Sequence, residues 1–346
     1  MITKVELKNF TVFENIILDF SSGINIFIGE NGTGKTHLMK VIYAACTTID
    51  SKQQKTFPQK LCNVFYPDNK NIGRLIHRAV GRNSCSISIE RNDVDTSSIQ
   101  LNITSLMKKS SEASIIMSKN WQEDVRYQAI YIPVKDMMAN APGFVALYEN
   151  NHIYFEEIYV DILNKVYLPT LKGPCDNDRK QLLTTLSKAI SGKVVEKNGI
   201  FYLNGKSSGG NLEFTLLAEG YRKLGLLWSL IQNGVLTKGS LLFWDEPEAN
   251  LNPKLAKTVA EILLKLQKMG VQIFIATHDY VFLKELDFAT TAKDKVKYFS
   301  LYKENGSIKH SETEHFENIE NNPIADAFND LLNREIQRSL EVNNGN

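Results

Sequence analysis

Hydrophobic and polar positions along the chain follow a pattern that predicts an α/β fold. Thr3–Phe10 alternates, and Asn15–Phe20 resumes the apolar character after a turn, so these segments are predicted to form an antiparallel pair. Ile24–Ile28, Leu241–Trp244 and Val271–Ala276 are short, largely apolar runs, each followed by polar residues. Strands buried on both faces of a parallel sheet have this character. These three runs are therefore predicted to lie in one parallel sheet.

Several segments instead place their apolar residues at helical spacing. A helix is predicted from Lys35, with Leu38, Met39, Ile42, Tyr43 and Cys46 on its apolar face. A second is predicted after Pro253, with Leu255, Val259, Ile262, Leu263 and Leu266 on one face and Gly270 at its end. Further helices are predicted over Ile153–Tyr167, Asp176–Ser191, Leu224–Ile231 and around Ala325–Leu340, with a broken one over Met137–Ala146.

The remaining segments predict shorter strands and one long loop. Cys85–Glu90, Ile99–Thr104 and Ser114–Met117 alternate as in an antiparallel meander, and Arg126–Pro133 resembles a buried strand closed by proline. Lys193–Lys197 and Ile200–Leu203 are predicted to form a hairpin through Asn198-Gly199, and Val296–Leu301 a last strand. Asp50–Lys70 is polar and contains two prolines, which favours loop.

The composition is that of an ordinary soluble protein. The 346 residues are 43% hydrophobic and 23% charged, and 40 Lys and Arg balance 39 Asp and Glu. The net charge therefore indicates neither nucleic acid nor a membrane as a partner. Cys46, Cys62, Cys85 and Cys175 form no C-x-x-C pair, which argues against a zinc site and fits a reducing compartment. No signal peptide or membrane-spanning run is found, and a cytoplasmic location is expected.

The run that follows the first apolar strand matches the phosphate-binding P-loop, G-x-x-x-x-G-K-[ST]. It consists of Gly29, Glu30, Asn31, Gly32, Thr33, Gly34, Lys35 and Thr36. The glycines let backbone N–H groups approach phosphate oxygens, and the helix that follows points its positive end at the same anion. Lys35 is expected to reach the β- and γ-phosphates, and Thr36 to hold Mg²⁺ through its hydroxyl. The sequence thus predicts a nucleoside triphosphate site.

Two carboxylates and a histidine follow the other apolar strands. Asp245 and Glu246 end the strand that begins at Leu241, and His278 comes soon after Ala276. Because ligands bind beyond the carboxyl ends of parallel strands, all three are expected beside the P-loop. Asp245 is predicted to bind Mg²⁺ through water, Glu246 to orient or deprotonate the attacking water, and His278 to sense the γ-phosphate.

Gly29–Thr36, Leu241–Glu248 and Ala276–Asp279 together resemble the ABC-superfamily ATPases. Within that superfamily they are most similar to the non-transporter branch, the SMC, RecF and OLD-type proteins. The resemblance covers about residues 1–46 and 212–301. It implies a P-loop NTPase fold with an ABC-type mixed central β-sheet flanked by helices, an antiparallel β meander and a helical subdomain. ATP and Mg²⁺ are the cofactors that it implies.

The family's signature loop, which caps the nucleotide of a second subunit, corresponds here to Leu217–Lys223. The resemblance implies nucleotide contacts from Ala218, Glu219, Gly220 and Arg222. Ala218 stands where the γ-phosphate-binding serine is expected, which is a departure from the family pattern. Asn252 likewise replaces the usual D-loop acid, and Lys135-Asp136 is the nearest polar pair to a Q-loop.

The resemblance also implies one ATPase domain over 1–346. Lobe I is expected over 1–133 plus 236–310, lobe II over about 134–235, and a C-terminal extension over 311–346. The expected function is ATP hydrolysis by two copies that close head to tail around ATP, as a homodimer or higher oligomer. That cycle is expected to act on DNA or RNA or to gate a separate nuclease effector, in phage defence or DNA maintenance.

Two alternatives stay open at this stage. In the first, Ala218 weakens turnover and the chain is a slow ATP-dependent scaffold or switch. In the second, the chain is the ATP-binding subunit of a transporter, which the departure from the signature sequence disfavours. Two further segments carry an open choice. The arginines of Asn71–Arg82 either contact phosphate or DNA or form a solvated helix face. The aromatic residues between Phe144 and Tyr159 either stack on bases or form the core of a helical subdomain.

Overall fold

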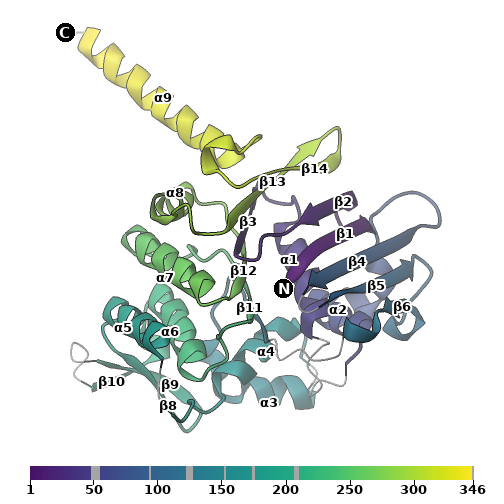
Figure 1. Ribbon diagram of the computed structural model, residues 1–346, viewed down its shortest axis with the longest axis horizontal. Helices are drawn as coiled ribbons and strands as arrows, with labels where there is room; N and C mark the ends of the chain where they lie inside the picture. Colours follow the sequence, from purple (N-terminus) through teal and green to yellow (C-terminus); the bar gives the residue numbers. More distant parts are fainter. Residues whose placement is uncertain are drawn as a thin grey trace.

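The computed structural model describes residues 1–47, 55–92, 95–121, 128–151, 153–173, 176–205 and 210–344. Its central sheet has the strand order β14-β13-β3-β12-β11-β7 (Figure 1). The strands are β3 (Ile24–Gly29), β7 (Ala129–Ile132), β11 (Leu241–Asp245), β12 (Gln272–Ala276), β13 (Val296–Glu304) and β14 (Ser307–Thr313). All neighbours run parallel except β14, which is antiparallel to β13. The predicted parallel arrangement of the three apolar runs is confirmed.

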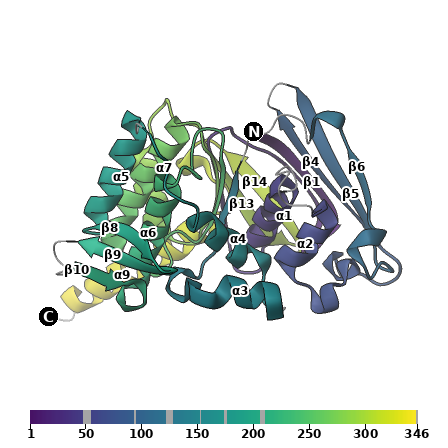
Figure 2. The same ribbon diagram turned by 90° about the horizontal axis from the view of Figure 1, so that it is seen from below.

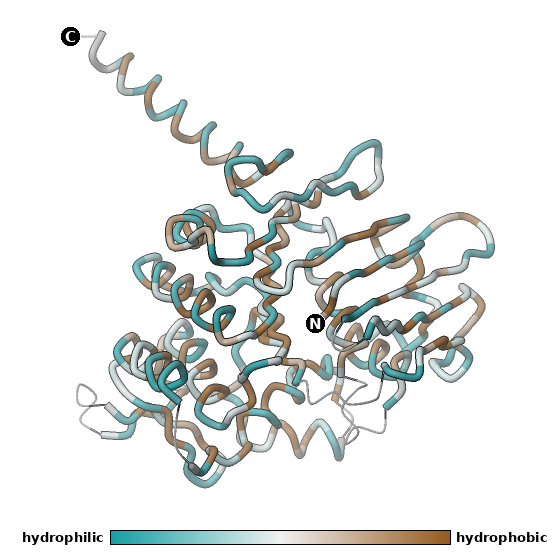
Figure 3. Tube along the Cα trace, viewed as in Figure 1, coloured by the Kyte–Doolittle hydropathy of each residue, from teal (hydrophilic) through white to brown (hydrophobic). Residues whose placement is uncertain are grey.

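Both faces of this sheet are buried, which explains its nearly continuous apolar strands. In β3, Ile26 and Ile28 enter one core, whereas Phe27 enters the core on the opposite face. In β12 the same alternation places Ile275 in the first core and Phe274 in the second. The alternation is therefore present in three dimensions although the sequence shows no polar face. In the tube coloured by hydropathy, these strands form a mostly hydrophobic centre (Figure 3).

One face of the central sheet packs with two helices and a second sheet. The helices are α1 (Lys35–Thr47) and α2 (Phe57–Phe65), and the second sheet has the order β2-β1-β4-β5-β6 (Figure 2). Its strands are β1 (Ile2–Phe10), β2 (Phe13–Asp19), β4 (Ser84–Asn92), β5 (Thr96–Thr104) and β6 (Ser114–Met117). The predicted N-terminal pair and the predicted meander are thus one antiparallel sheet.

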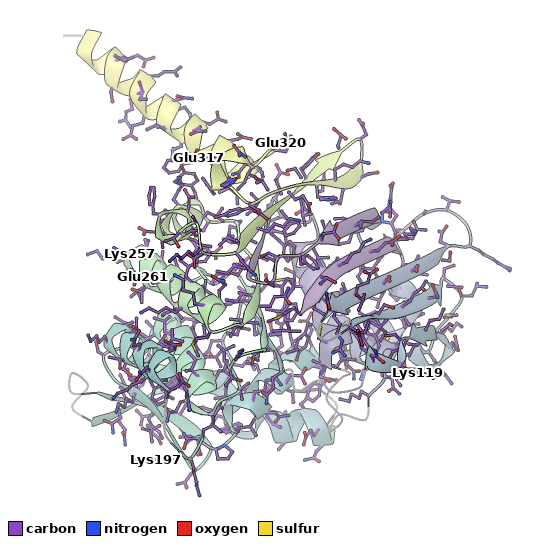
Figure 4. All side chains as sticks on the ribbon, viewed as in Figure 1. Lys119, Lys197, Lys257, Glu261, Glu317 and Glu320 are labelled. Carbon is purple, nitrogen blue, oxygen red and sulfur yellow. The ribbon has the colours of Figure 1, made fainter. Side chains whose placement is uncertain are left out.

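The opposite face packs against a helical layer (Figure 1). It contains α3 (Ala141–Asn151), α5 (Asn177–Ala189), α6 (Glu219–Gln232), α7 (Ala256–Lys268) and α8 (Tyr280–Ala289). Helix α4 (Glu157–Val166) contributes to both cores, with Ile162 and Leu163 in this one and Ile158 in the other. A small sheet, β8 (Lys193–Lys197), β9 (Ile200–Gly205) and β10 (Gly210–Glu213), lies below the helical layer. Lys257 projects from the outer side of α7 and Lys197 from the β8–β9 turn (Figure 4). The predicted hairpin through Asn198-Gly199 is confirmed.

The prediction of loop over Asp50–Lys70 is wrong where α2 forms. Pro58 lies in the first turn of α2, where a missing N–H breaks no hydrogen bond, so it starts the helix and does not interrupt it. The side chain of Gln59 accepts a hydrogen bond from the Thr56 backbone N–H at 2.9 Å. This Thr-x-x-Gln pattern is an N-terminal capping signal. Residues 50–54 of the predicted loop lie outside the described part of the chain.

Other element boundaries also differ from prediction. The helix predicted over Ile153–Tyr167 begins only at Glu157, and β14 was not predicted although Asn305-Gly306 marks its hairpin turn. β10 was also missed. In the segment Asn71–Arg82 a short 3-10 turn forms over Ile72–Leu75, with both ends buried. Residues 126 and 127 of the predicted strand lie outside the described residues.

The C-terminal helix α9 (Pro323–Asn344) extends away from the rest of the molecule (Figure 1). Glu317 and Glu320 lie close to its start (Figure 4). The helix is longer than the predicted Ala325–Leu340 and carries exposed apolar residues, among them Leu332 and Leu340. In the described part of the chain, no helix combines the length and apolar character needed to cross a bilayer.

A buried polar junction joins α4 to the helices α1 and α2. The side chain of Lys60, on α2, is 1% exposed, and its ammonium contacts the carboxylates of Glu157 and Asp161, on α4. The hydroxyl of Tyr43, on α1, donates to Asp161 at 2.7 Å. A buried charge is tolerated only when it is paired and hydrogen-bonded. This junction therefore fixes α4 against the helix that follows the P-loop.

Candidate functional site

The P-loop lies between the end of β3 and the start of α1, as predicted. Gly34 has φ of +94°, and a Cβ there would lie 2.4 Å from the Phe13 ring, so only glycine fits. Gly29 similarly has φ of +145°, and a Cβ would lie 2.2 Å from the Leu301 carbonyl oxygen. The loop is thus pressed between the β1–β2 turn and β13.

Two side chains of the P-loop bond to its own backbone. The ammonium of Lys35 donates to the carbonyl oxygens of Gly29 at 2.7 Å and Glu30 at 3.0 Å. The hydroxyl of Thr33 also donates to the Glu30 carbonyl, at 2.9 Å. Burial lowers the pKa of Lys35, although carboxylates nearby, led by Asp245, act in the opposite direction. The lysine is thus held inside the curve of the loop.

Asp245 is joined to the P-loop helix by a hydrogen bond. The Thr36 hydroxyl donates to Oδ1 of Asp245 at 3.3 Å, and the Tyr131 hydroxyl donates to Oδ2 at 3.1 Å. Asp245 is 5% exposed, and this burial raises the pKa of its carboxyl group. The two hydrogen bonds act in the opposite direction and lower that pKa. A hydroxyl beside a carboxylate is a set of hard oxygen donors, which suits Mg²⁺. These residues fit the magnesium that the sequence implies.

Glu246 and His278 lie together at the same edge of the sheet. Nδ1 of His278 is 3.3 Å from Oε1 of Glu246, and both side chains are partly exposed. Glu246 has φ of +48°, a strained conformation for a residue with a side chain. Its backbone N–H donates to the carbonyl oxygen of Ala276, the last residue of β12. The neighbouring strand thus helps to hold the turn that presents this carboxylate.

Glu248 connects the loops after β11 and β12. Its Oε1 accepts hydrogen bonds from the Thr277 hydroxyl at 2.7 Å and from the His278 backbone N–H at 3.3 Å. Burial raises the pKa of Glu248, and the bond from Thr277 opposes that shift. The sequence contained the Asp-Glu-Pro-Glu motif, but only the fold shows that its last residue fixes the backbone of His278.

The signature segment packs on the loop after β11. Ala218 precedes α6 and makes no side-chain cap, while Glu219 accepts a hydrogen bond from the Asn250 side chain at 2.9 Å. A Cβ on Gly220 would lie 2.9 Å from the Asn250 carbonyl oxygen, so glycine allows this approach. Arg222 donates to the carbonyl oxygens of Leu217 and Thr215. These contacts involve residues 215–217 and 250, not the P-loop.

Lys223 connects α6 to the backbone of Glu246. Its ammonium is buried, with the residue 1% exposed, and donates to the carbonyls of Glu246 at 3.2 Å and Ala249 at 2.8 Å. Burial lowers the pKa of Lys223, and four carboxylates, Glu219 foremost, act against that shift. A buried ammonium thus holds the turn on which Glu246 is presented.

A cavity of about 570 Å³ lies beside the P-loop at Gly32. Val12, His37 and Phe65 line it, together with Arg74 and Arg78 from the predicted basic segment. Burial, and next the ammonium of Lys40, lower the pKa of His37 to about 4, so its ring is neutral at pH 7. The cavity combines apolar walls with cationic side chains next to the P-loop.

The fold thus brings most of the predicted site together. Lys35, Thr36, Asp245, Glu246 and His278 meet at the carboxyl ends of β3, β11 and β12. The signature residues Ala218, Glu219, Gly220 and Arg222 start α6 instead, on the loop after β11. Sequence reasoning did not find the contacts that Tyr131, Glu248 and Lys223 make in the site. Tyr131 lies in an apolar strand and Lys223 near the charged start of a helix. Neither sequence context indicates which residues these side chains contact.

Two family models match the chain. One, described as "AAA domain, putative AbiEii toxin, Type IV TA system", matches residues 109–284, just over half of the chain. The chain belongs to this AAA-domain family. A second model, described as "AAA ATPase domain", matches residues 1–159. The two matches together cover the strands and loops of the site, so the AAA assignment agrees with the predicted ATPase class.

Curated relatives of this AAA-domain chain match over short stretches. It is 37% identical over 91 residues to the DNA replication and repair protein RecF of Bacillus mycoides, covering 26% of this chain and 22% of that protein. It is 49% identical over 47 residues to RecF of Cytophaga hutchinsonii, covering 14% and 12%. The matches thus span less than a quarter of the relatives' own length.

Solved structures are similar over most of the AAA-domain chain. An SMC head bound to the C-terminal winged-helix domain of ScpA has a TM-score of 0.57 at 16% identity, covering 91% of this chain and 98% of that one. An Smc head from Pyrococcus furiosus with an extended coiled coil has a TM-score of 0.51 at 13% identity, covering 97% and 99%. At these identities the likeness shows the fold alone, and that fold confirms the predicted α/β class.

Proposed function

We propose that the chain binds ATP with Mg²⁺, hydrolyses it, and closes as a head-to-tail pair around two nucleotides. The contact between Thr36 and Asp245 carries this proposal, because it joins the P-loop helix to the strand that bears the acidic residues, 209 positions away. A hydroxyl and a carboxylate so placed suit the magnesium of a bound nucleotide. The AAA-domain family match supports the same class of activity.

Each residue has a proposed role in that reaction. Lys35 and the backbone of 29–36 bind the phosphates. Thr36 and Asp245 would hold Mg²⁺, which would stabilise the charge that develops on the transferred phosphoryl group. Glu246 orients and deprotonates the attacking water. His278, whose Nδ1 is 3.3 Å from Oε1 of Glu246, contacts the γ-phosphate. Glu248 holds the backbone of His278. The cavity at Gly32 receives the base and sugar.

The second copy is proposed to contribute its signature segment. In one subunit Glu219 and Lys223 form hydrogen bonds with residues 246–250, and Gly220 packs closely against Asn250. The start of α6 also presents a positive helix end. A nucleotide on another copy is the ligand proposed for this end, so that ATP would link two subunits.

Glu219 favours a second candidate function, the slow ATP-dependent scaffold or switch. Its carboxylate stands in the first turn of α6, tethered by Asn250, and Ala218 supplies no hydroxyl there. A negative charge beside an incoming triphosphate weakens the contact that completes the second site. Slow turnover with stable ATP-bound dimers would separate this candidate from an active motor. The transporter subunit has no such observation in its favour.

The partner and the biological role are proposed at a coarser level. By likeness to the RecF proteins and to the SMC heads, whose names mention DNA repair and ScpA, we propose that the ATP cycle acts on DNA or RNA or on a separate effector protein. The family, described as a putative toxin of a type IV TA system, supports a defence role. A cytoplasmic location is part of the same proposal.

Light scattering tests the proposed ATP-dependent head-to-tail dimerisation. It measures the mass of the Glu246→Gln variant with and without ATP. Removal of the proposed base should trap the ATP-bound state, so this variant is expected to become a dimer or larger species with ATP and Mg²⁺. Lys35→Ala is the control that should stay unchanged. Wild-type hydrolysis is measured alongside. If Glu246→Gln binds ATP and its mass stays constant, head-to-tail closure is wrong.

A further inference from the structure

The strand register places Tyr131 next to the proposed magnesium site. In the parallel pair of β7 and β11, Tyr131 is aligned with Phe243, two residues before Asp245. Its hydroxyl donates to Oδ2 of Asp245, on the oxygen that Thr36 does not contact. Each oxygen of this buried carboxylate therefore accepts one hydrogen bond, and the two donors come from different elements.

We propose that Tyr131 is a positioning residue for divalent cation binding, which acts by fixing the Asp245 carboxylate. This inference rests on the proposed function, because it assigns Mg²⁺ and nucleotide to the same site. A carboxylate rotates about its Cβ–Cγ bond unless both oxygens are held. Tyr131 holds Oδ2, so Oδ1 stays directed at the Thr36 hydroxyl. Partners of this kind around a metal site typically change metal affinity by about 10- to 100-fold.

Tyr131 is itself rigid. It is 1% exposed, and its ring stacks on Phe243 with centroids 6.3 Å apart and planes at 10°. Tyr43 packs edge-on against it, with centroids 5.4 Å apart. A buried hydroxyl on a ring that is packed on two sides has little freedom to leave its acceptor. Packing thus converts one hydrogen bond into a fixed orientation of Asp245.

Tyr43 offers a matched control within the same aromatic cluster. It is equally buried and touches the Tyr131 ring, but its hydroxyl donates to Asp161 at 2.7 Å, not to Asp245. Replacement of either tyrosine by phenylalanine removes one buried hydroxyl and retains the ring. The two variants carry a similar structural cost, but only Tyr131→Phe changes a contact of Asp245.

The experiment uses the full chain and the fluorescent nucleotide mant-ATP. Binding is measured in excess EDTA and then as MgCl₂ is added, for wild type, Tyr131→Phe and Tyr43→Phe. Tyr131→Phe is expected to need about 10- to 100-fold more Mg²⁺ for half-maximal effect, with EDTA binding unchanged. Tyr43→Phe is expected to match wild type. Melting temperatures of the two variants show whether both are folded.

The outcomes separate the inference from the proposed function. If wild type shows no Mg²⁺-dependent binding of mant-ATP, the proposed function fails. If wild type responds to Mg²⁺ and Tyr131→Phe responds identically, or if Tyr43→Phe shows the same loss, the positioning role is overturned.

A double-mutant cycle gives a second route that survives poor folding of Tyr131→Phe. In the Asp245→Asn background no buried charge is left unpaired, so the added Tyr131→Phe change is better tolerated. If Tyr131 acts through Asp245, adding Tyr131→Phe to Asp245→Asn leaves the Mg²⁺ requirement unchanged. A further loss in the double variant would show that Tyr131 acts elsewhere, against the proposal.

Discussion

The ammonium of Lys223 donates a hydrogen bond to the backbone carbonyl of Glu246, at 3.2 Å. The first of these residues lies in the helix that starts at Glu219, and the second is the proposed catalytic base. The bond therefore joins the surface proposed to meet a second subunit with the chemistry of the subunit's own site. Because Glu246 has φ of +48°, its turn depends on such support from outside.

Lys223→Met should lower ATP turnover about tenfold with little change in ATP affinity, because small displacements of a catalytic group are costly. Methionine retains an unbranched side chain close in length to the lysine stem and removes the ammonium that holds Glu246 and Ala249. Steady-state hydrolysis and mant-ATP binding check this. Lys257→Met, on the outer side of α7 (Figure 4), is the matched control and should behave as wild type. Equal turnover in both variants would contradict the coupling.

Ala218→Ser should raise turnover by about tenfold, the order expected of one added hydrogen bond to a charged group. The serine hydroxyl restores the donor that the start of α6 lacks. Glu219→Gln should act in the same direction, because it removes a negative charge next to the proposed triphosphate. Hydrolysis rates at saturating ATP measure both. No increase in either variant would argue against a nucleotide at this helix end.

Gly34→Ala should abolish nucleotide binding, because φ of +94° and a Cβ 2.4 Å from the Phe13 ring both oppose a side chain. Gly199→Ala separates the two causes. Gly199, in the β8–β9 turn, also has positive φ, +80°, but a Cβ there would meet nothing within 4 Å beyond its chain neighbours. That control should cost only about 1 kcal/mol of folding free energy and leave mant-ATP binding intact. Binding by Gly34→Ala at wild-type strength would contradict the observed loop packing.

The stability of the protein should fall between pH 6.5 and pH 4 in part through His37. Burial lowers the pKa of its ring to about 4 from an ordinary 6.5, so the unfolded chain binds a proton in this range and the folded chain does not. The contribution is complete above pH 6.5 and lost by pH 4, and amounts to at most about 3 kcal/mol.

Urea unfolding of wild type and His37→Gln at several pH values tests this sign. The free energy of unfolding of the variant should depend less steeply on pH between 4 and 6.5 than that of wild type. Measurements of both proteins at pH 7.5 provide the reference, because the histidine is neutral there in either state. Parallel pH curves would show that His37 is not buried as described.

The sequence predicted the site better than it predicted the elements around it. Lys35, Thr36, Asp245 and Glu246 could be placed because motifs at the ends of apolar strands have fixed spacing, and parallel strands bring those ends together. The role of Tyr131 could not be predicted, because it depends on which residue of β11 lies opposite Tyr131. The sequence of β7 alone does not determine that register. Lys223 and Glu248 likewise act through backbone groups of distant loops.

Local signals also competed with one another. Pro58 suggested a loop, whereas Thr56 and Gln59 marked a helix start, and the capping arrangement prevails in the structure. The Asn305-Gly306 turn of the β13–β14 hairpin was visible in the sequence and was passed over. The division into two lobes stays a prediction, with lobe I over 1–133 and 236–310 and lobe II over about 134–235. The individual roles of the site residues also stay predictions.

The position of β3 has a consequence for how the chain is made. This strand, near the N-terminus, lies between β12 and β13, whose residues come about 250 positions later. During synthesis, β3 and the P-loop must therefore wait without their neighbours until nearly the whole chain has left the ribosome. A message cut short before residue 272 would yield a polypeptide that carries the complete P-loop motif but neither of the strands that flank β3.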